Sequence, residues 1–164
     1  MFEVVGSSST STDEAVAFAH RAWRELFAER TASPGMPADL ANFAATYCRA
    51  GACFVLARTP EGEVIGSIAY RPYDGRFAAL DVPPEGCAEV VRLYVLPQLR
   101  RAGLGSALFQ RLQQQALACG VRQLYLHTHP FLPGAIGFWE RQGFHTLLAE
   151  AEPVWQTHHM LKTL

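Results

Sequence analysis

The sequence predicts an α/β (α+β) fold, in which a mixed, mostly antiparallel sheet of about seven strands is flanked by about four helices. Three observations predict it. Short β-prone runs and amphipathic helical runs follow one another in the order β-α-α-β-β-β-α-β-α-β-β. The β-prone runs 53–58 and 63–70 are joined by "TPEG", which is typical of an antiparallel hairpin. One strand–helix–strand unit over 88–128 predicts a crossover to a parallel neighbour, so the sheet is mixed.

Elements of the first half follow from apolar spacing and from turn residues. Residues 2–5 form a short β-prone run, and apolar residues recur at helical spacing over 13–29, where Ser11 and Glu14 suggest a capping box. The segment "SPGMP" at 33–37 ends this pattern. A second helix is expected from residue 38 to about residue 49, with a glycine stop at Gly51.

Elements of the second half begin after the polar, proline-rich segment 71–86, which is expected to be a loop. The predicted strands share β-prone composition, and the predicted helices share helical spacing and a following glycine. The strands are 88–96, 121–128, 144–150 and 154–162, and the helices are 106–118 and 134–142.

Composition restricts the possible functions. The chain has 164 residues, 49% of them apolar, with a net charge of −1 and a pI of about 6.6, which fits one domain over 1–164 and gives no electrostatic case for nucleic acid. No apolar run is long enough to cross a bilayer, and the N-terminal residues lack a basic leader before an apolar stretch. We therefore expect a cytoplasmic protein that does not act at a membrane.

The four cysteines indicate neither a metal site nor a disulfide framework. Cys48, Cys53, Cys87 and Cys119 form no CxxC pair and lie among small or apolar residues. We expect reduced thiols, most of them packed in the interior, and no bound metal.

A glycine-rich connection between a strand and a helix predicts an anion site. In "PQLRRAGLG" at 97–105, Gly103 and Gly105 allow close approach to the unpaired N–H groups of a helix start, and Arg100 and Arg101 add positive charge. The spacing is neither G-x-G-x-x-G nor G-x-x-x-x-G-K-(S/T), so dinucleotide and nucleoside-triphosphate sites lose their main support. An ordinary tight turn with surface arginines is the alternative.

The spacing Arg100-x-x-Gly103-x-Gly105 resembles the (Gln or Arg)-x-x-Gly-x-(Gly or Ala) motif that binds the acetyl-CoA pyrophosphate in the GNAT superfamily of N-acetyltransferases. The preceding "AEVVRLYVLP" is similar to the fourth strand of that family, and "AIGFWERQGF" at 135–144 is similar to a later helix. The order of elements also matches the GNAT fold. The resemblance is specific over about residues 88–144 and rests on helix order before residue 50.

The resemblance implies that strands 4 and 5 splay apart and that acetyl-CoA, the cosubstrate, lies between them. Backbone groups of Leu93, Tyr94 and Val95 would pair with the pantetheine arm. Arg100 and the backbone N–H groups that follow it would hold the pyrophosphate; these belong to Arg101, Ala102, Gly103, Leu104, Gly105 and Ser106. The later helix would add Phe138, Trp139 and Arg141 to the coenzyme A site.

Catalysis by a GNAT enzyme requires removal of a proton from the amine, and the family comparison suggests Glu89 as the general base. The alternative is a strand-start glutamate that faces solvent or pairs with Arg92. Trp139 stands where many members carry a tyrosine acid, and an indole cannot supply that proton. Three alternatives remain: another side chain replaces the acid (Tyr94, Tyr125, His127 or His129), solvent protonates the thiolate, or no acid is needed. We prefer His129 as the replacement, and the competing interpretation is that this histidine is only structural.

The function that the resemblance implies is transfer of an acetyl group from acetyl-CoA to a primary amine, by direct attack in a ternary complex. The acceptor is expected to be a small molecule such as an amino acid, a polyamine or an antibiotic-like amine. Tyr70, Tyr73 and Asp74 are weak candidates for substrate contact. A protein N-terminal or lysine acetyltransferase and a non-catalytic acyl-CoA-binding or sensing protein remain as alternatives. A homodimer paired through C-terminal edge strands is also compatible with the family.

Overall fold

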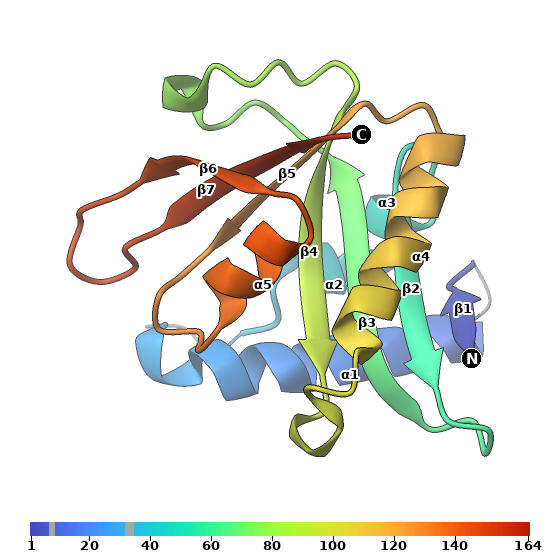
Figure 1. Cartoon of the computed structure of the whole chain (residues 1–164). Coiled ribbons are helices and arrows are strands. Elements are labelled where there is room, and N and C mark those ends of the chain that lie inside the picture. Colours follow the sequence, from blue (N-terminus) through green and yellow to red (C-terminus); the bar gives the residue numbers. More distant parts are fainter. Residues whose placement is uncertain (7–8, 32–34) are drawn as a thin grey trace.

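The fold is built around a single β-sheet (Figure 1). The computed structural model describes residues 1–6, 9–31 and 35–164. Over these residues the strand order of the sheet is β1-β2-β3-β4-β5-β7-β6. Only β4 and β5 pair in parallel within this described sheet, so the mixed, mostly antiparallel topology is confirmed. The strands are β1 (Phe2–Val4), β2 (Cys53–Arg58), β3 (Val64–Pro72), β4 (Cys87–Val95), β5 (Gln123–Thr128), β6 (His145–Ala149) and β7 (His158–Thr163).

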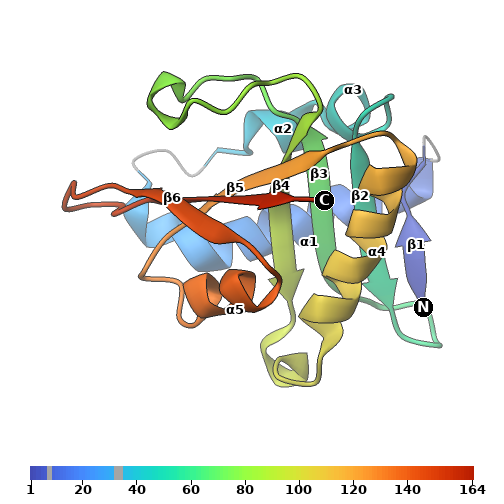
Figure 2. The ribbon, with the colours of Figure 1, turned by 45° about the horizontal axis from the view of Figure 1, so that its top comes forward.

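Helices cover both faces of the sheet. Figures 1 and 2 show α4 and α5 on one face and α1 crossing the other, with α2 and α3 beside α1. The helices are α1 (Ser9–Phe27), α2 (Ala38–Ala41), α3 (Phe43–Tyr47), α4 (Leu104–Ala118) and α5 (Ala135–Arg141). Three short 3₁₀-helices are η1 (Ala28–Arg30), η2 (Ala78–Leu80) and η3 (Pro97–Leu99). Within the described residues, no helix is long and apolar enough to cross a membrane.

The apolar face of α4 packs on the centre of the sheet and forms the main core. Leu108, Phe109 and Leu112 are at most 2% exposed and lie in one cluster with Val55 and Ile68 of the sheet. Burial of such side chains contributes about 1.5–3 kcal/mol each. This core fixes the start of α4 relative to β4.

Two predicted helix boundaries were wrong. The helix predicted to start near residue 13 begins at Ser9, so Ser11 lies inside α1 and its hydroxyl donates to Glu3 Oε1 at 2.6 Å. The helix predicted over 38–49 is broken at Asn42, whose amide Nδ2 donates to the carbonyl of Ala38 at 2.9 Å. Asparagine side chains compete with the helix in this way. Residues 33 and 34 of the predicted stop segment lie outside the described residues.

The last strand begins later than predicted: residues 153–155 form a turn, and β7 starts only at His158. Glu152 holds this turn: one carboxylate oxygen accepts the N–H of Val154 at 2.9 Å, and the other accepts the N–H groups of Trp155 and Gln156. A carboxylate that accepts several backbone N–H groups offers the chain an alternative to the strand ladder.

β4 and β5 part shortly after they meet, as predicted. Their ladder joins Cys87 to Gln123, Ala88 to Leu124 and Glu89 to Tyr125, and then it ends. β4 continues to Val95 and β5 to Thr128, and Figure 1 shows the two strands diverging. The divergence leaves a strand edge whose backbone groups need another partner.

Candidate functional site

A cavity of about 770 Å³ lies where β4 and β5 diverge. Residues 90–95 of β4 and 126–129 at the end of β5 line two of its sides. The connection to α4, the helix α5 and the second half of α1 line most of the rest, and Asp39, Ser67, Arg71 and Trp155 also contribute. Its size is in the range of sites for drug-sized ligands and cofactors, and it opens on the unpaired edge of β4.

The connection between β4 and α4 has the geometry of an anion cradle. Gly103 has a φ of +82° and precedes the first residue of α4, and Arg101 also has a positive φ of +67°. Among the described residues, no side chain caps the first turn of α4, and a Cβ added at Gly103 would point into open space. A 15-residue helix with a bare first turn offers N–H donors and a positive dipole end to an anion.

The arginine at the start of the motif is held against β4. Arg100 Nε donates to the carbonyl of Val95 at 2.9 Å, and its guanidinium lies 5.2 Å from the centre of the Tyr94 ring. A longer contact of 3.7 Å joins Arg100 to Glu25, where both side chains are 47% exposed. The positive charge therefore stays at the cavity mouth, next to the glycine loop.

α5 closes the cavity from the other side. A Cβ added at Gly105 would lie 3.4 Å from the ring of Phe138, which is ordinary van der Waals contact, so the space beside α5 admits a small residue at this position. Trp139 is 7% exposed and packs edge-on against Phe109 with ring centres 5.7 Å apart. Phe138, Trp139 and Arg141 all line the cavity, although the indole mainly serves as packing between α4 and α5.

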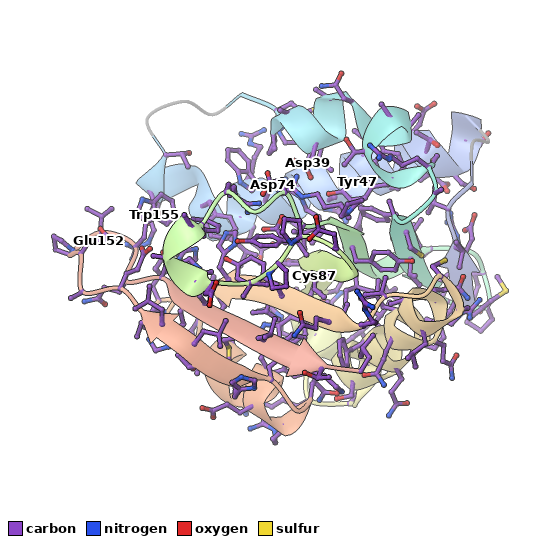
Figure 3. The ribbon with its side chains drawn as sticks, turned by 90° about the horizontal axis from the view of Figure 1, so that it is seen from above. Asp39, Tyr47, Asp74, Cys87, Glu152 and Trp155 are labelled. Atoms are coloured by element: carbon purple, nitrogen blue, oxygen red, sulfur yellow. The ribbon has the colours of Figure 1, made fainter. Side chains whose placement is uncertain are left out.

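A bulge in β4 turns the strand at the cavity. Arg92 has a φ of +60°, which is unusual for a non-glycine residue, and the pairing with β3 shifts register beside it. Arg92 does not pair with Glu89, which was one expectation; it forms a two-point ion pair with Asp39 of α2. Tyr47 donates its hydroxyl to the same carboxylate at 2.5 Å, and Figure 3 shows Asp39 and Tyr47 on the α2–α3 side of the sheet.

The Asp39–Arg92 pair is largely buried, with side chains 9% and 16% exposed. Burial would raise the pKa of Asp39, but hydrogen bonds and charge from Arg92 outweigh it and hold the pKa below its usual range. The carbonyl of Arg92 accepts the hydroxyl of Ser67 at 2.8 Å. These contacts stabilise a backbone conformation that would otherwise cost about 1–3 kcal/mol.

Glu89 lies at the last rung of the β4–β5 ladder and is fully buried. Arg71 Nε donates to it at 2.9 Å, Arg76 binds both carboxylate oxygens, and His127 Nδ1 lies 3.4 Å from Oε1. Burial alone would raise the pKa of Glu89, but its imidazole and guanidinium neighbours hold it well below the usual range. The carboxylate is therefore a weak proton acceptor, and Glu89 lines neither cavity described here.

His127 and His129 are two residues apart and line the same space. Their ring centres are 5.9 Å apart, and both also line a smaller adjoining cavity of about 300 Å³. The carbonyl of Trp155 can only accept, so His129 Nδ1 carries the proton of their 3.1 Å contact and Nε2 is left with a lone pair. Burial and nearby His127 lower the pKa of His129, which argues against a proton-donating role near neutral pH.

The two tyrosines considered as acids have other partners. Tyr94 donates its hydroxyl to Glu25 at 2.5 Å, and burial together with that carboxylate raises the pKa of Tyr94 to about 12. Tyr125 is fully buried, and its hydroxyl lies 2.7 Å from His159 Nδ1. Neither hydroxyl is free to donate into the cavity.

The structure does not bring the predicted substrate-contact residues to the cavities. Tyr70 is fully buried in the core, and Tyr73 is buried against Tyr125 with ring centres 4.7 Å apart. Asp74 is 61% exposed and accepts a hydrogen bond from Arg76 (Figure 3). Five residues that line the smaller cavity carried no sequence motif: Phe77, Glu150, Trp155, Thr157 and His159.

Remaining titratable groups do not form a metal or thiol centre in the part of the chain that the structure describes. No group of three or more His, Cys, Asp or Glu side chains there could hold a metal ion. The four thiols are free, and burial raises the pKa of Cys53 and that of Cys87 to about 11.

Comparison with known proteins identifies the family. The model of the acetyltransferase (GNAT) family matches residues 18–144. An uncharacterized N-acetyltransferase of Escherichia coli is 34% identical over 84 residues, which are 51% of this chain and 46% of that protein. An uncharacterized N-acetyltransferase of Schizosaccharomyces pombe is 30% identical over 108 residues, 66% of this chain and 61% of that protein. The matches thus span about half the length of these relatives.

Solved structures share the fold at low identity. An acetyltransferase of the GNAT family from Staphylococcus aureus has a TM-score of 0.77 at 17% identity, with 100% of this chain and 99% of the other covered. The PaiA N-acetyltransferase of Thermoplasma acidophilum, in complex with coenzyme A, has a TM-score of 0.67 at 15% identity, with 100% and 99% covered.

Proposed function

The chain belongs to the acetyltransferase (GNAT) family, and on this premise we propose that it transfers an acetyl group from acetyl-CoA to a small primary amine. One observation carries the proposal: the cavity between the diverging strands is closed at one end by a glycine loop and a bare helix start. A nucleotide-like ligand with a pyrophosphate and a narrow arm fits such a site, because the loop supplies N–H donors and β4 supplies an unpaired edge.

We assign the coenzyme A contacts accordingly. Backbone N–H groups from Arg101 to Ser106 bind the pyrophosphate, with Arg100 as the adjacent positive charge. Backbone groups of Leu93, Tyr94 and Val95 pair with the pantetheine arm, in the manner of an added strand. Phe138, Trp139 and Arg141 form the opposite wall. The bound thioester supplies an acetyl carbon that an amine can attack.

The reaction is a direct transfer within a ternary complex. The amine nitrogen forms a bond to the acetyl carbon, the carbon–sulfur bond breaks, and the amine gives up one proton. A covalent acyl-enzyme is not needed, and the high pKa values of the buried thiols argue against one. The leaving thiolate takes a proton from solvent, because Trp139 stands where many family members carry a tyrosine acid. Thiolate is a good leaving group, so the carbon–sulfur bond can break without that acid.

We propose that the proton from the amine goes to a histidine and that Glu89 acts through that histidine. His127 lines the cavity, and its Nδ1 lies 3.4 Å from the Glu89 carboxylate, so this contact favours a proton on Nδ1 and a lone pair on Nε2. His129 presents the same tautomer through Trp155. Glu89 is then a positioning residue, and the role first considered for His129 changes from acid to base.

Calorimetric titration with acetyl-CoA tests the coenzyme A site. Gly103→Val should abolish binding, because valine disfavours a φ of +82° and its side chain would fill the cradle. Gly120→Val is the matched control: its φ is +75°, a Cβ there also meets open space, and it lies at the other end of α4. The control should keep wild-type affinity at a comparable loss of stability, and ATP should bind neither protein.

Two results would contradict the proposal. If acetyl-CoA does not bind the wild-type protein, Gly103 and Gly105 only form a turn and do not form a pyrophosphate site. Binding without release of coenzyme A in the presence of any primary amine would instead support a non-catalytic acyl-CoA-binding protein.

A further inference from the structure

The smaller cavity, of about 300 Å³, adjoins the coenzyme A cavity and has its own chemistry. The two share His127, His129 and Trp155, so a ligand in the smaller cavity meets the larger one at the histidines. Its other walls include Phe77, Glu150 and His159. In Figure 3, Trp155, which lines both cavities, lies beside the loop that contains η2.

The carboxylate of Glu150 is fixed in this cavity by a buried chain of hydrogen bonds. His159 is 1% exposed; its Nε2 lies 3.0 Å from Glu150 Oε1, and its Nδ1 lies 2.7 Å from the Tyr125 hydroxyl. Burial and the charge of Glu89 raise the pKa of Tyr125, so the hydroxyl keeps its proton and donates to Nδ1. His159 then donates from Nε2 to Glu150, whose side chain remains 37% exposed.

The walls around this carboxylate are aromatic. Phe77 lies edge-on to His159 with ring centres 4.8 Å apart, and Trp155 lies 5.3 Å from His129. Aromatic faces and a carboxylate together attract an ammonium group. The low pKa of His129 keeps that imidazole neutral near neutral pH, so it does not repel a cation.

No lysine or arginine lines the smaller cavity among the residues that the structure describes. Arg76 lies on the Phe77 ring, 4.6 Å from its centre, but it is bound to Glu89 and Asp74. Within the described lining of the smaller cavity, a ligand carboxylate would therefore face Glu150 without a lysine or arginine to bind it. The cavity favours a positive group and disfavours a negative one.

We propose that this cavity selects a short diamine as the acetyl acceptor, an inference that rests on the proposed function. One amino group lies at the shared histidine wall and is acetylated: its nitrogen bonds to the acetyl carbon, the thioester carbon–sulfur bond breaks, and its proton passes to a histidine Nε2. The second amino group stays an ammonium and lies against Glu150 and the aromatic walls. Amino acids are poor acceptors, because their carboxylate would be repelled.

Calorimetry with three probes of similar length tests this selection, with coenzyme A present so that no turnover occurs. Putrescine carries a second ammonium, pentylamine carries a methyl group there, and 5-aminovalerate carries a carboxylate. Putrescine should bind about tenfold more tightly than pentylamine, because a partly exposed ion pair and a cation–π contact each contribute a few-fold. 5-Aminovalerate should bind least well.

Two variants locate the effect. Glu150→Gln keeps an acceptor for His159 and should bring putrescine to within about twofold of pentylamine, because the ion pair is lost. Glu140→Gln, an exposed residue of α5 outside both cavities, should keep the tenfold preference.

The outcomes separate this inference from the proposed function, because acetyl-CoA binding is measured on the same protein. If acetyl-CoA binds but putrescine and pentylamine bind equally, or if Glu150→Gln keeps the preference, the diamine assignment is overturned and the acetyltransferase proposal stands. If acetyl-CoA does not bind, both are overturned.

Discussion

Asp39→Asn should destabilise the protein and weaken acetyl-CoA binding, because it removes the partner of a largely buried arginine. Arg92 is 16% exposed and keeps its charge in the variant, with only one amide oxygen to accept a hydrogen bond. Removal of one member of a buried ion pair costs about 3–5 kcal/mol, and the retained amide oxygen places this variant near about 3 kcal/mol. For a chain of this size, that corresponds to a fall in Tm of about 6–12 °C.

The effect should depend on pH in a defined direction. The pKa of Asp39 is lower in the folded protein than its usual value, so the pair contributes stability above the unfolded pKa of about 3.9. This contribution is lost as the pH falls through the folded pKa. The difference in free energy of unfolding between wild type and Asp39→Asn should therefore be largest near neutral pH and shrink below about pH 4.

Thermal and urea unfolding of both proteins, with acetyl-CoA titrations alongside, measure these effects. Glu14→Gln is a matched control, because Glu14 is 48% exposed and its partner Arg58 keeps Glu3. This control should change stability by at most about 1 kcal/mol. If Asp39→Asn unfolds at the temperature of the control, the ion pair does not stabilise the β4 bulge and the explanation of the positive φ at Arg92 is wrong.

Two further predictions concern catalysis and the thiols. With the amine that reacts best, His127→Gln should lower kcat by about 10²-fold with little change in acetyl-CoA affinity. Glu89→Gln should lower kcat less and should alter the dependence of kcat on pH. If both variants lose the same activity at every pH, both residues have only a structural role. Iodoacetamide near neutral pH should modify the exposed Cys119 before the buried Cys53 and Cys87, and mass spectrometry can follow the order of modification. Protein modified only at Cys119 should still transfer acetyl groups, because Cys119 lines neither cavity. Loss of activity on this first modification would contradict a direct transfer.

The glycine loop could be predicted from sequence because its chemistry is local. A positive φ, a bare helix start and a charge at the loop all lie between Arg100 and Gly105, so their residue types are neighbours in the chain. Element order followed from the same kind of short-range pattern. The divergence of β4 and β5 could be predicted only from the family resemblance, because no residue pattern within either strand indicates where their ladder ends.

The surroundings of Glu89 could not be predicted, because its partners come from three separate segments. Arg71 is the penultimate residue of β3, although it was expected to lie in a loop; Arg76 lies in the connection that follows β3, and His127 is on β5. Sequence identified the carboxylate on the strand but not the two guanidinium groups that keep it ionised. The same holds for Glu150, whose role depends on His159 across a strand connection.

The site exists because contacts remote in sequence end one ladder. Glu89 and Tyr125 form its last rung, and each has a polar partner from a distant segment: Arg71 of β3 and Arg76 for the carboxylate, and His159 of β7 for the hydroxyl. Three residues later, the bulge at Arg92, held by Asp39, turns β4 away. Unpaired strand edges cost free energy, so two parallel strands keep pairing unless something prevents it. Here polar contacts fix both residues of the last rung, and the strained Arg92, three residues further along β4, turns that strand away from β5. The cavity therefore depends on side chains that are far apart in the sequence and form no local motif. The loop that closes it, in contrast, consists of six consecutive residues and can be recognised from them.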